Sequence, residues 1–292
     1  MEKLDKAWLS RNPLPAPSEG GDKNARGRVL VVGGAEFVPG ALRLTGEAAL
    51  RSGAGKLQLA TVRAAAMSLA VLMPEAAMIA LPADEDGEIA AEAAELLAHR
   101  LKDCDALVLG PGMSASERTE ILVAAMLGGA AGQAIVLDAA ALTSTGNLAQ
   151  LVAAQGGRVI MTPHYGEMSH LTGLAMEQIA ADPAAAATRV ARDFNAVVVL
   201  KGMRTVIVAP TGEALLFEGG SKGLATGGSG DVLAGIVGGM AARGSEPLIA
   251  AAWGVFVHGT AGEHAATEIA EIGFLARDLL PLIPAIVAEL GG

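Results

Sequence analysis

Short runs of β-branched residues and leucine recur along the chain without polar interruption. Such runs are typical of strands that are buried on both faces of a parallel sheet. The first run, residues 28–34, ends in two glycines. Further strands are expected at 56–61, 76–81, 106–109, 134–137, 159–161, 196–200 and 205–209.

Alanine- and leucine-rich segments with helical spacing lie between most of these runs. Helices are expected at 42–52, 88–100, 118–127 and 176–194, and in the last third at 231–243, 247–270 and 276–290. The alternation of strand and helix favours a layered α/β/α domain with a mostly parallel central sheet. Residues 210–213, Pro-Thr-Gly-Glu, predict a hairpin turn between two antiparallel strands at the sheet edge.

The domain organisation follows from the polar and apolar segments. Residues 1–27 are polar and rich in Pro and Gly, so an irregular N-terminal lead-in is expected there. Residues 28–292 contain no repeat, low-complexity tract or linker, and are expected to form a single domain. Neither an uninterrupted apolar stretch of about 20 residues nor an apolar leader stands out, so a cytoplasmic protein without membrane contact is expected.

The composition excludes several classes of protein. Of 292 residues, 52% are hydrophobic and 18% are charged, which excludes an intrinsically disordered chain. A net charge of −10 and an aromatic content of 3% argue against a nucleic-acid partner. Cys104 is the single cysteine, so neither an intrachain disulfide nor a cysteine-based zinc site can form.

A glycine-rich loop at 225–231, which leads directly into an apolar helix, carries the most specific chemistry. Glycines let the backbone approach a ligand, and the helix N-terminus adds unpaired N–H groups and its positive dipole end. The N–H groups of Gly228, Ser229 and Gly230 could stabilise charge on a phosphoryl group during transfer. Asp231 could accept the proton of an attacking hydroxyl. In the structural alternative, the glycines form a tight turn and Asp231 caps the helix.

The other glycine motifs in the sequence are less specific for a function. The loop is not a G-x-S-x-G nucleophile elbow, and no Walker P-loop sequence occurs. The segment 110–115 fits G-x-G-x-x-A after a strand, and Asp138 follows the next strand, as in dinucleotide-binding folds. Pro111 and a capping-box pattern from Ser114 to Glu117 argue against that interpretation. We expect instead a ligand-binding loop at the carboxyl end of a strand.

Two further loops follow strands and carry polar side chains. His164 and Glu167 could supply a hydrogen-bonding ring and a carboxylate for a hydrated cation, or could simply begin a helix. The segment 201–205, Lys-Gly-Met-Arg-Thr, could contact phosphate or ribose, or could form a hairpin turn with solvated charges. His258 could lie near the ligand or in a helix contact.

Taken in order, these segments resemble one family, the NAD(P)H-hydrate dehydratases of the ribokinase-like superfamily. The resemblance begins near residue 22 and covers nearly the whole chain. It rests on the motifs Gly27-Arg-Val-Leu-Val-Val-Gly-Gly34, Ala48-Ala-Leu-Arg-Ser-Gly-Ala-Gly55, Leu109-Gly-Pro-Gly112, Thr162-Pro-His-Tyr-Gly-Glu167, Thr226-Gly-Gly-Ser-Gly-Asp-Val-Leu-Ala-Gly235 and His258-Gly-Thr-Ala-Gly262. The Gly-Gly-Ser-Gly-Asp loop is shared with other ribokinase-like kinases, whereas the Thr-Pro-His-x-Gly-Glu segment favours the dehydratases.

The resemblance implies an enzyme that repairs nicotinamide cofactors. Family members remove water from the S-form hydrates NADHX and NADPHX with Mg²⁺ and a nucleotide, typically ADP in bacteria and ATP in eukaryotes. The ring hydroxyl would be phosphorylated and the phosphate ester eliminated, so that ADP gives AMP and phosphate. Matching motifs imply that the hydrate is bound by Ala41, Gly112, His164 and Asp231. They imply that the nucleotide is bound by Lys201, Gly202, Met203, Arg204, Thr205 and Gly230, and Mg²⁺ by Glu167.

Three segments depart from the family pattern, and each bears on substrate preference. After the strand expected at 134–137, the family often has a second aspartate two residues beyond the position of Asp138, where this chain has Ala140. The lead-in keeps Lys23 but lacks the usual His-Lys pair. Residues 36–39, Glu-Phe-Val-Pro, replace a loop that is usually small or contains tyrosine.

Three functions stay open at this point. The chain could be an ADP-dependent dehydratase, a ribokinase-like small-molecule kinase, or a nucleotide-binding relative without turnover. Release of phosphate with recovery of absorbance at 340 nm would separate the dehydratase from the kinase. The choices between ADP and ATP, and between NADHX and NADPHX, also stay open. A homo-oligomer is expected from the resemblance, with a tetramer as one candidate.

Overall fold

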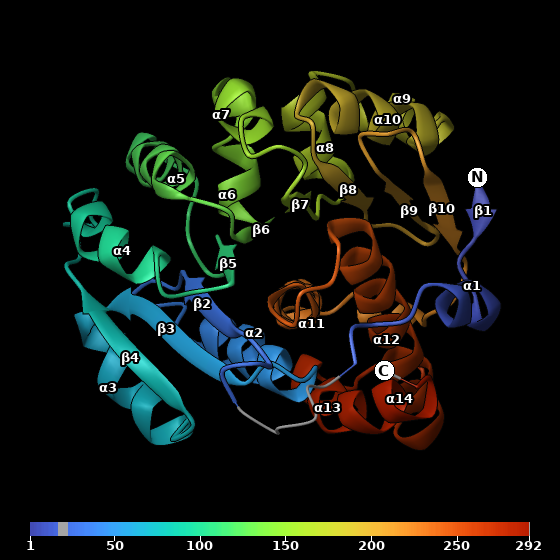
Figure 1. Ribbon diagram of the computed structural model, residues 1–292, viewed down its shortest axis with the longest axis horizontal. Helices are drawn as coiled ribbons and strands as arrows, with labels where there is room; N and C mark the ends of the chain where they lie inside the picture. Colours follow the sequence, from blue (N-terminus) through green and yellow to red (C-terminus); the bar gives the residue numbers. More distant parts are fainter. Residues whose placement is uncertain (17–22, 292) are drawn as a thin grey trace.

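The structure is a computed structural model that describes residues 1–16 and 23–291. One ten-stranded sheet forms its centre, in the order β1-β10-β9-β8-β7-β6-β5-β2-β3-β4. Figure 1 shows this sheet as an arc from β4 on the left to β1 on the right. The parallel strands β2 to β8 span Arg28–Val32, Lys56–Val62, Ala76–Leu81, Ala106–Leu109, Ala134–Leu137, Val159–Met161 and Val197–Leu200. The expected mostly parallel sheet is thus confirmed.

The antiparallel part of the sheet lies at the opposite end from β4. β9 (Thr205–Val208) pairs antiparallel with β8 and with β10 (Ala214–Phe217), which confirms the hairpin turn at 210–213. The expectation that this hairpin forms the sheet edge is wrong. β1 (Glu2–Lys3) pairs in parallel with β10 and takes the edge position.

Two helical layers cover the sheet because successive strand residues point to opposite faces. In β2, Val29 and Val31 pack into one apolar cluster, whereas Leu30 and Val32 pack into the other. The first cluster includes α2 (Gly40–Arg51), α11 (Ser229–Ala242), α12 (Pro247–Glu268), α13 (Ala276–Leu279) and α14 (Ile283–Glu289). The second includes α4 (Ala93–Leu101), α5 (Glu117–Gly129), α8 (Tyr165–Thr172), α9 (Met176–Ala181) and α10 (Pro183–Asp193). Figure 1 shows the two layers below and above the sheet.

The N-terminal segment corrects the expectation of an irregular lead-in. Besides β1 it forms α1 (Lys6–Arg11), which begins where Asp5 Oδ1 accepts a hydrogen bond from the Trp8 N–H at 2.9 Å. Trp8 is 3% exposed and packs in the first cluster. Charged residues alternate with these few apolar positions, so neither element has a clear periodic signal in the sequence. Residues 17–22 of the expected lead-in lie outside the described residues.

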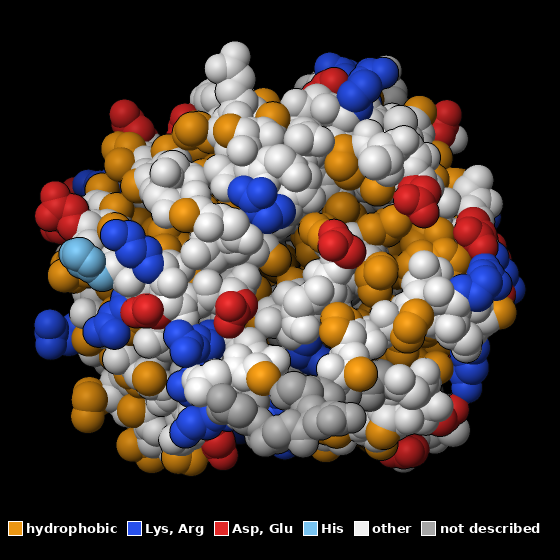
Figure 2. Space-filling model, viewed as in Figure 1, with side chains coloured by type: hydrophobic (Ala, Val, Ile, Leu, Met, Phe, Trp, Pro, Cys, Tyr) orange, Lys and Arg blue, Asp and Glu red, His pale blue; other side chains and the backbone are white. Residues whose placement is uncertain are grey.

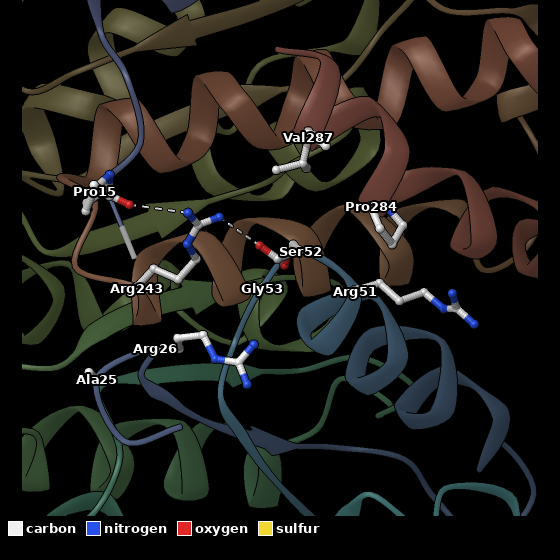
Figure 3. A pocket seen from close by; sticks show the side chains of 11 residues that line it. Pro15, Ala25, Arg26, Arg51, Ser52, Gly53, Arg243, Pro284 and Val287 are labelled. Carbon is white, nitrogen blue, oxygen red and sulfur yellow. Dashed lines mark hydrogen bonds between the residues drawn. The ribbon is translucent and has the colours of Figure 1, made fainter. Parts of the chain in front are cut away.

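Hydrogen bonds from two long side chains hold this segment on the helical layer. Trp253 Nε1 donates to the Asn12 carbonyl at 2.8 Å. Arg243, at the end of α11, donates to the Pro15 carbonyl at 3.3 Å and to the Ser52 carbonyl at 3.2 Å. Figure 3 shows the Arg243 guanidinium between these two carbonyls, beside a small cavity of ≈ 220 Å³. The first residues are therefore part of the packed domain.

Several helices differ from their expected bounds. The segment expected as one helix at 176–194 divides into α9 and α10, because Pro183 begins a new helix that Asp182 caps. The segment expected at 276–290 divides into α13, a 3₁₀ turn Leu280–Leu282 and α14. Helix α3 (Arg63–Leu72) and the short helices α6 (Ala140–Thr143) and α7 (Ala149–Ala153) were not expected.

Helix α11 approaches α2 and the sheet unusually closely. A Cβ built on Gly235 would lie 2.1 Å from the Thr45 carbonyl oxygen. A Cβ built on Gly239 would lie 2.1 Å from Ser52 Oγ, and one on Gly238 2.3 Å from Val108 Cγ2. Glycine is required at these positions because no side chain fits. The contact fixes the N-terminus of α11 at the carboxyl ends of the central strands.

The surface carries charges of both signs. On the face shown in Figure 2, acidic and basic side chains are intermixed, with apolar side chains between them. The net charge of −10 is thus not collected in one patch on this face. Within the described ranges, we find no helix that combines the length and the apolar character needed to cross a membrane.

Candidate functional site

The strands β2 and β5 are neighbours in the sheet, yet the chain leaves them in opposite directions. From β2 it continues to β3 and β4, whereas from β5 it continues to β6, β7 and β8. Open α/β sheets bind ligands in the crevice at the carboxyl ends of such a pair. Here those ends carry Gly33-Gly34 and Gly110-Pro111-Gly112. We call these loops at the carboxyl ends of β2 and β5 the switch point, and we take them as one half of the candidate site.

Backbone atoms line most of the switch point. Gly112 has φ +70°, and a Cβ built on it would lie 2.8 Å from Ala41 Cβ and 2.9 Å from the Val38 carbonyl oxygen. Ala41 and Gly112, both expected to bind the hydrate, are therefore neighbours. Thr61 Oγ1 adds a polar group, because it is buried and has no hydrogen-bond partner among the described residues. It lies 2.9 Å from a Cβ built on Gly34.

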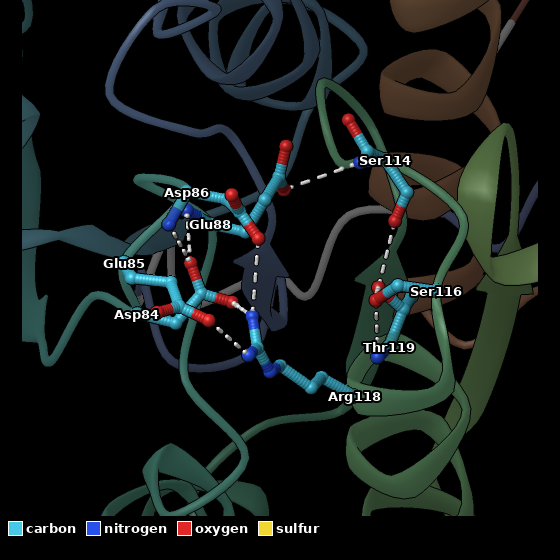
Figure 4. Close-up of polar contacts among 8 residues, drawn as sticks. All are labelled: Asp84, Glu85, Asp86, Glu88, Ser114, Ser116, Arg118 and Thr119. Carbon is cyan, nitrogen blue, oxygen red and sulfur yellow. Dashed lines mark hydrogen bonds and ion pairs between the residues drawn. The ribbon is translucent and has the colours of Figure 1, made fainter.

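An acidic loop forms the rim of the switch point and is held by one arginine. Arg118 contacts Asp84 and Glu85 at 2.8 and 2.9 Å, and Asp86 at 3.2 Å. Glu88 Oε2 accepts a hydrogen bond from the Ser114 N–H at 3.2 Å, as Figure 4 shows. The same loop accepts a hydrogen bond from the Glu36 N–H at the Gly87 carbonyl. The rim is thereby joined to both switch-point loops.

The capping box expected from Ser114 to Glu117 does not form, and helix α5 instead begins with a simple N-cap two residues later. Ser116 is the N-cap of α5, and its Oγ accepts a hydrogen bond from the Thr119 N–H at 3.1 Å. Thr119 in turn donates its hydroxyl to the Ser114 carbonyl at 2.7 Å (Figure 4). The helix therefore begins after the loop, so the 110–115 segment is a turn at the carboxyl end of β5.

The glycine-rich loop ends at the N-terminus of α11. Gly228 is the N-cap residue at φ +88° and provides no side-chain cap. Among the described residues, the N–H groups of Gly230 and Asp231 form no hydrogen bond, as expected of a helix N-terminus. The Ser229 N–H differs, because it donates to the Thr226 carbonyl at 3.3 Å. One of the three N–H groups expected to face an anion is therefore already engaged.

Asp231 is the third residue of α11 and is partly buried. Its carboxylate is not the side-chain cap of the helix, so the structural alternative for this residue is not observed. Burial, together with the negative charge of Asp138, raises the pKa of Asp231 to about 7, although Lys201 acts in the opposite direction. A carboxyl group with such a pKa can accept and release a proton near neutral pH.

Lys201 places a positive charge beside the same helix terminus. Its Nζ lies 3.0 Å from Asp138 Oδ1, which also accepts a hydrogen bond from Thr162 Oγ1 at 2.6 Å. Burial disfavours the charge of Lys201, but Asp138 and Glu167 outweigh that effect and raise its pKa. A Cβ built on Gly230 would lie 3.5 Å from Lys201 Nζ. Oδ1 of Asp138 is thus held by Lys201 and Thr162, which argues against the ribose-binding role of the dinucleotide-fold interpretation.

His164 and Glu167 form a capping box at the start of α8. His164 Nδ1 accepts a hydrogen bond from the Gly166 N–H at 2.9 Å, and Glu167 Oε2 accepts one from the His164 N–H at 2.8 Å. The helix-start alternative is therefore present. Glu167 also lies 3.9 Å from Lys201 Nζ, and burial raises its pKa more than Lys201 lowers it. In residues 1–16 and 23–291, no three His, Cys, Asp or Glu side chains gather as a metal site.

A cavity of ≈ 610 Å³ lies beside the β8–β9 hairpin, and we call it the hairpin cavity. Its volume is typical of pockets for small molecules and cofactors. The expected site residues that line it are His164, Lys201, Gly202, Met203, Thr205, Ser229 and Gly230. Arg204 is not among the lining residues, and its Nη1 lies 3.8 Å from Glu218 Oε1. Ala41, Gly112 and Asp231 are not among them either.

The rest of the hairpin cavity is mostly apolar. Phe217, Leu224, Leu233 and Val255 contribute to its wall. Phe217 is fixed by an edge-to-face contact with Phe256, at a centroid distance of 5.6 Å. Ser221 also lines the cavity, and its Oγ is buried without a hydrogen-bond partner in the described part of the chain. Such a wall suits a flat ring that carries a few polar groups.

Sequence reasoning missed several residues that the structure brings to the site. Asp138 was noted only in the dinucleotide interpretation and Thr162 only within the family motif, and neither was given a role at the site, although each is the first polar residue after a buried strand. Phe217 and Ser221 had none, because their position depends on how the β9–β10 hairpin folds back toward α12. His258 had been left between ligand and helix contact, and the structure gives it both: it lines the cavity and contacts Ser229.

Comparisons with known proteins agree with one another. A family model described as NAD(P)H-hydrate dehydratase matches residues 29–285. An ADP-dependent (S)-NAD(P)H-hydrate dehydratase of Xanthomonas campestris is 46% identical over 289 residues, covering 97% of this chain and 95% of that protein. A bifunctional NAD(P)H-hydrate repair enzyme of Moorella thermoacetica is 38% identical over 98% of this chain, which spans 54% of that longer protein.

Solved structures give the same picture. The ADP/ATP-dependent NAD(P)H-hydrate dehydratase of Bacillus subtilis, co-crystallised with ATP and Mg²⁺, has a TM-score of 0.82. It is 27% identical, and the match covers 99% of this chain and 98% of that one. A ribokinase-like superfamily protein of Enterococcus faecalis has a TM-score of 0.84 at 27% identity, covering 99% of this chain and 96% of that one. The expected ribokinase-like fold is confirmed.

Proposed function

This chain belongs to the NAD(P)H-hydrate dehydratase family, and on that premise we propose the reaction and the roles of its residues. The enzyme removes water from the S-form hydrates NADHX and NADPHX, with ADP as co-substrate and AMP and phosphate as products. One observation carries the assignment of roles. Asp231 directly follows Gly230, which lines the hairpin cavity, and it lies within the electrostatic influence of Asp138, whose backbone packs against Gly110 of the switch point.

The nucleotide occupies the hairpin cavity. Its base lies against the apolar wall near Phe217 and Leu224, and its phosphates point to Lys201 and the N-terminus of α11. Helix N-termini bind phosphate through unpaired N–H groups and the helix dipole. The N–H of Gly230 is free for this purpose, and the positive charge of Lys201 lies beside it.

The hydrate occupies the switch point, with its ring hydroxyl toward Asp231. Asp231 accepts the hydroxyl proton while the oxygen attacks the terminal phosphorus of ADP, and the phosphorus–oxygen bond to AMP breaks. AMP leaves with that bonding pair. The carbon–oxygen bond of the phosphorylated ring then breaks, phosphate leaves with the electron pair, and the neighbouring ring carbon loses a proton to solvent. The ring double bond of NADH or NADPH is restored.

The environment of Asp231 suits this role. Its pKa of about 7 keeps a substantial fraction ionised at neutral pH while leaving it basic enough to take a proton. Lys201 and the α11 N-terminus are fixed before the reaction begins, so charge that develops on the phosphoryl group meets oriented dipoles.

Mg²⁺ is proposed to enter on the nucleotide phosphates. The residues present fit such an ion and not a resident metal, because Glu167 and Asp138 are the nearby carboxylates and no third ligand joins them in the described part of the chain. Mg²⁺ usually keeps several waters and binds through one or two carboxylates plus phosphates. Glu167 would hold it, and the ion would offset negative charge on the phosphates.

The test is an absorbance assay at 340 nm with chemically hydrated NADH. Purified protein receives ADP, ATP or no nucleotide, each with Mg²⁺, and inorganic phosphate is measured in parallel. Recovery of absorbance with equimolar phosphate is expected with ADP. A stable phosphorylated hydrate without recovery would indicate a kinase. No conversion by folded protein that binds ADP would contradict the proposed function.

A further inference from the structure

The reaction described above leaves one titratable side chain at the glycine loop without a role. His258 of α12 lines the hairpin cavity, and its Nε2 lies 3.0 Å from Ser229 Oγ. Ser229 is the first residue of α11 and is 4% exposed. This hydrogen bond joins the first turn of α11 to the following helix α12, directly beside the site where phosphate is proposed to bind.

Ser229 cannot use its N–H fully for an anion. That N–H donates to the Thr226 carbonyl at 3.3 Å, whereas the N–H of the following Gly230 is free. The hydroxyl is then the group through which Ser229 can donate to a ligand. A hydroxyl offers one hydrogen, so the direction of its bond to His258 decides whether that hydrogen is available.

The tautomer of His258 sets this direction. If Nε2 carries the ring proton, His258 donates to Ser229 Oγ, and the Ser229 hydrogen is free to point into the cavity. If Nδ1 carries the proton, Nε2 accepts the Ser229 hydrogen, and only lone pairs face the cavity. An anion in the cavity selects the first arrangement, because lone pairs repel it and a hydroxyl hydrogen attracts it.

We propose that His258 is a positioning residue that donates from Nε2 to Ser229 and thereby aims the Ser229 hydroxyl at the transferred phosphoryl group. This inference rests on the proposed function for the identity of the anion. Burial lowers the pKa of His258 to about 4, although a hydrogen bond with the Ser229 backbone acts in the opposite direction, and the charge of Lys201 lowers it further. His258 is therefore neutral in the working range, where it can act as a fixed donor and does not titrate.

Two substitutions of matched chemistry test the proposal. The side-chain amide of glutamine reaches about as far as Nε2 of histidine, whereas that of asparagine reaches only about as far as Nδ1. His258→Gln should therefore keep the hydrogen bond to Ser229 and most of kcat, and His258→Asn should lose it. Loss of one oxyanion donor lowers kcat roughly 100-fold in other enzymes. We expect His258→Asn and Ser229→Ala each to lower kcat by roughly 10- to 100-fold, with KM for ADP changed less.

The double variant is the second test. If His258 acts through Ser229, adding His258→Asn to Ser229→Ala should cause no further loss of kcat. Multiplied losses would overturn the proposal, as would equal kcat values for the Gln and Asn variants. A rise in KM for ADP with unchanged kcat would also overturn it, because His258 would then contribute only to nucleotide binding as part of the cavity wall.

The third test does not need turnover. In ¹⁵N-labelled protein with ADP and Mg²⁺, the ring nitrogens of His258 should show the Nε2–H tautomer and no protonation down to about pH 5. The Nδ1–H tautomer would overturn the proposal. If wild-type protein binds ADP but does not dehydrate the hydrate, the proposed function fails, whereas this measurement still decides the role of His258 toward a bound phosphate.

Discussion

The hairpin cavity and the switch point both lie at the carboxyl ends of the parallel strands, yet they are built differently. Side chains make the hairpin cavity: Phe217 and Leu224 form an apolar wall, and Lys201 brings a charge. Backbone makes the switch point, where a Cβ on Gly112 would meet Ala41 and the Val38 carbonyl. A pocket of side chains selects a shape, whereas a backbone-lined crevice lets a flat ring approach closely.

In the proposed mechanism, Asp231 links the two regions. It belongs to α11, whose N-terminus faces the hairpin cavity, but it does not line that cavity. The difference teaches that binding and chemistry should be separable here. Changes in one region should affect one substrate, and only the residue between them should stop the reaction while both substrates still bind.

The largest effect is expected from Asp231→Asn. The amide cannot accept the hydroxyl proton, and loss of a general base typically lowers kcat by roughly 10²- to 10⁴-fold. We expect a loss near the upper end of this range, measured by absorbance recovery at 340 nm. Affinity for ADP, measured by calorimetry, should stay within about threefold of wild type. Retained activity would remove Asp231 from the mechanism.

The next effect is expected from Gly112→Ala, which breaks the switch point. The new Cβ would lie 2.8 Å from Ala41 Cβ, at a backbone with φ +70°. Misplacement of a substrate by about 1 Å can cost roughly 100-fold, so kcat/KM for the hydrate should fall by about that factor. The affinity for ADP should be unchanged.

Gly173→Ala is the matched control for this change. Gly173 has the same φ of +70°, but a Cβ there meets no atom within 4 Å. It should show the backbone strain without the loss of kcat/KM for the hydrate. If both variants lose activity equally, strain and not the crevice explains the result.

A smaller effect is expected from Gly259→Ala, which narrows the hairpin cavity. A Cβ at 259 would lie 2.3 Å from Phe217 Cε1 and would push the ring. Such overpacking typically costs about 1–3 kcal/mol, so KM for ADP should rise roughly tenfold or more, with kcat at saturating ADP largely kept. Gly128→Ala, a helical glycine with open space, is the control. A change in KM for the hydrate alone would contradict the division between the two regions.

The smallest effect concerns stability and pH. The pKa of Asp231 is raised from 3.8 to about 7, so the folded state binds its proton more tightly than the unfolded state. The contribution of Asp231 to stability therefore falls as pH rises from about 4 to about 7, and the penalty is complete above that. Asp231→Asn should raise Tm by a few degrees at about pH 8, with the gain vanishing near pH 4. If the difference in Tm between Asp231→Asn and wild type were the same at both pH values, the raised pKa of Asp231 would be contradicted.

Much of the fold follows from local pattern. The runs of valine, leucine and isoleucine predicted the parallel strands closely, because strands buried on both faces cannot tolerate polar residues. The N-terminal elements could not be predicted in this way. β1 and α1 are short, and Leu4 and Trp8 are buried in an apolar cluster most of whose other members lie far away in the sequence. Tertiary contacts, and not a local pattern, therefore determine that these N-terminal residues form a strand and a helix.

The candidate site divides in the same way. Gly112, Gly228 and Asp231 could be singled out because a loop that follows a strand or precedes a helix has a readable motif. The raised pKa of Asp231 could not be predicted from the sequence, because it depends on burial and on the negative charge of Asp138, which follows the distant strand β6. Whether Ser229 contributes its N–H or its hydroxyl also needed coordinates.

The close contact between α11 and α2 has a consequence for reading genetic screens. Every missense change at Gly235 or Gly239 adds at least a Cβ, which would lie 2.1 Å from an existing oxygen. In a saturation-mutagenesis library scored by growth or activity, both positions should look as intolerant as Asp231, although neither glycine lines the hairpin cavity. Abundance of the variant protein separates the cases: the glycine variants should be depleted from the folded pool, whereas Asp231 variants should accumulate normally.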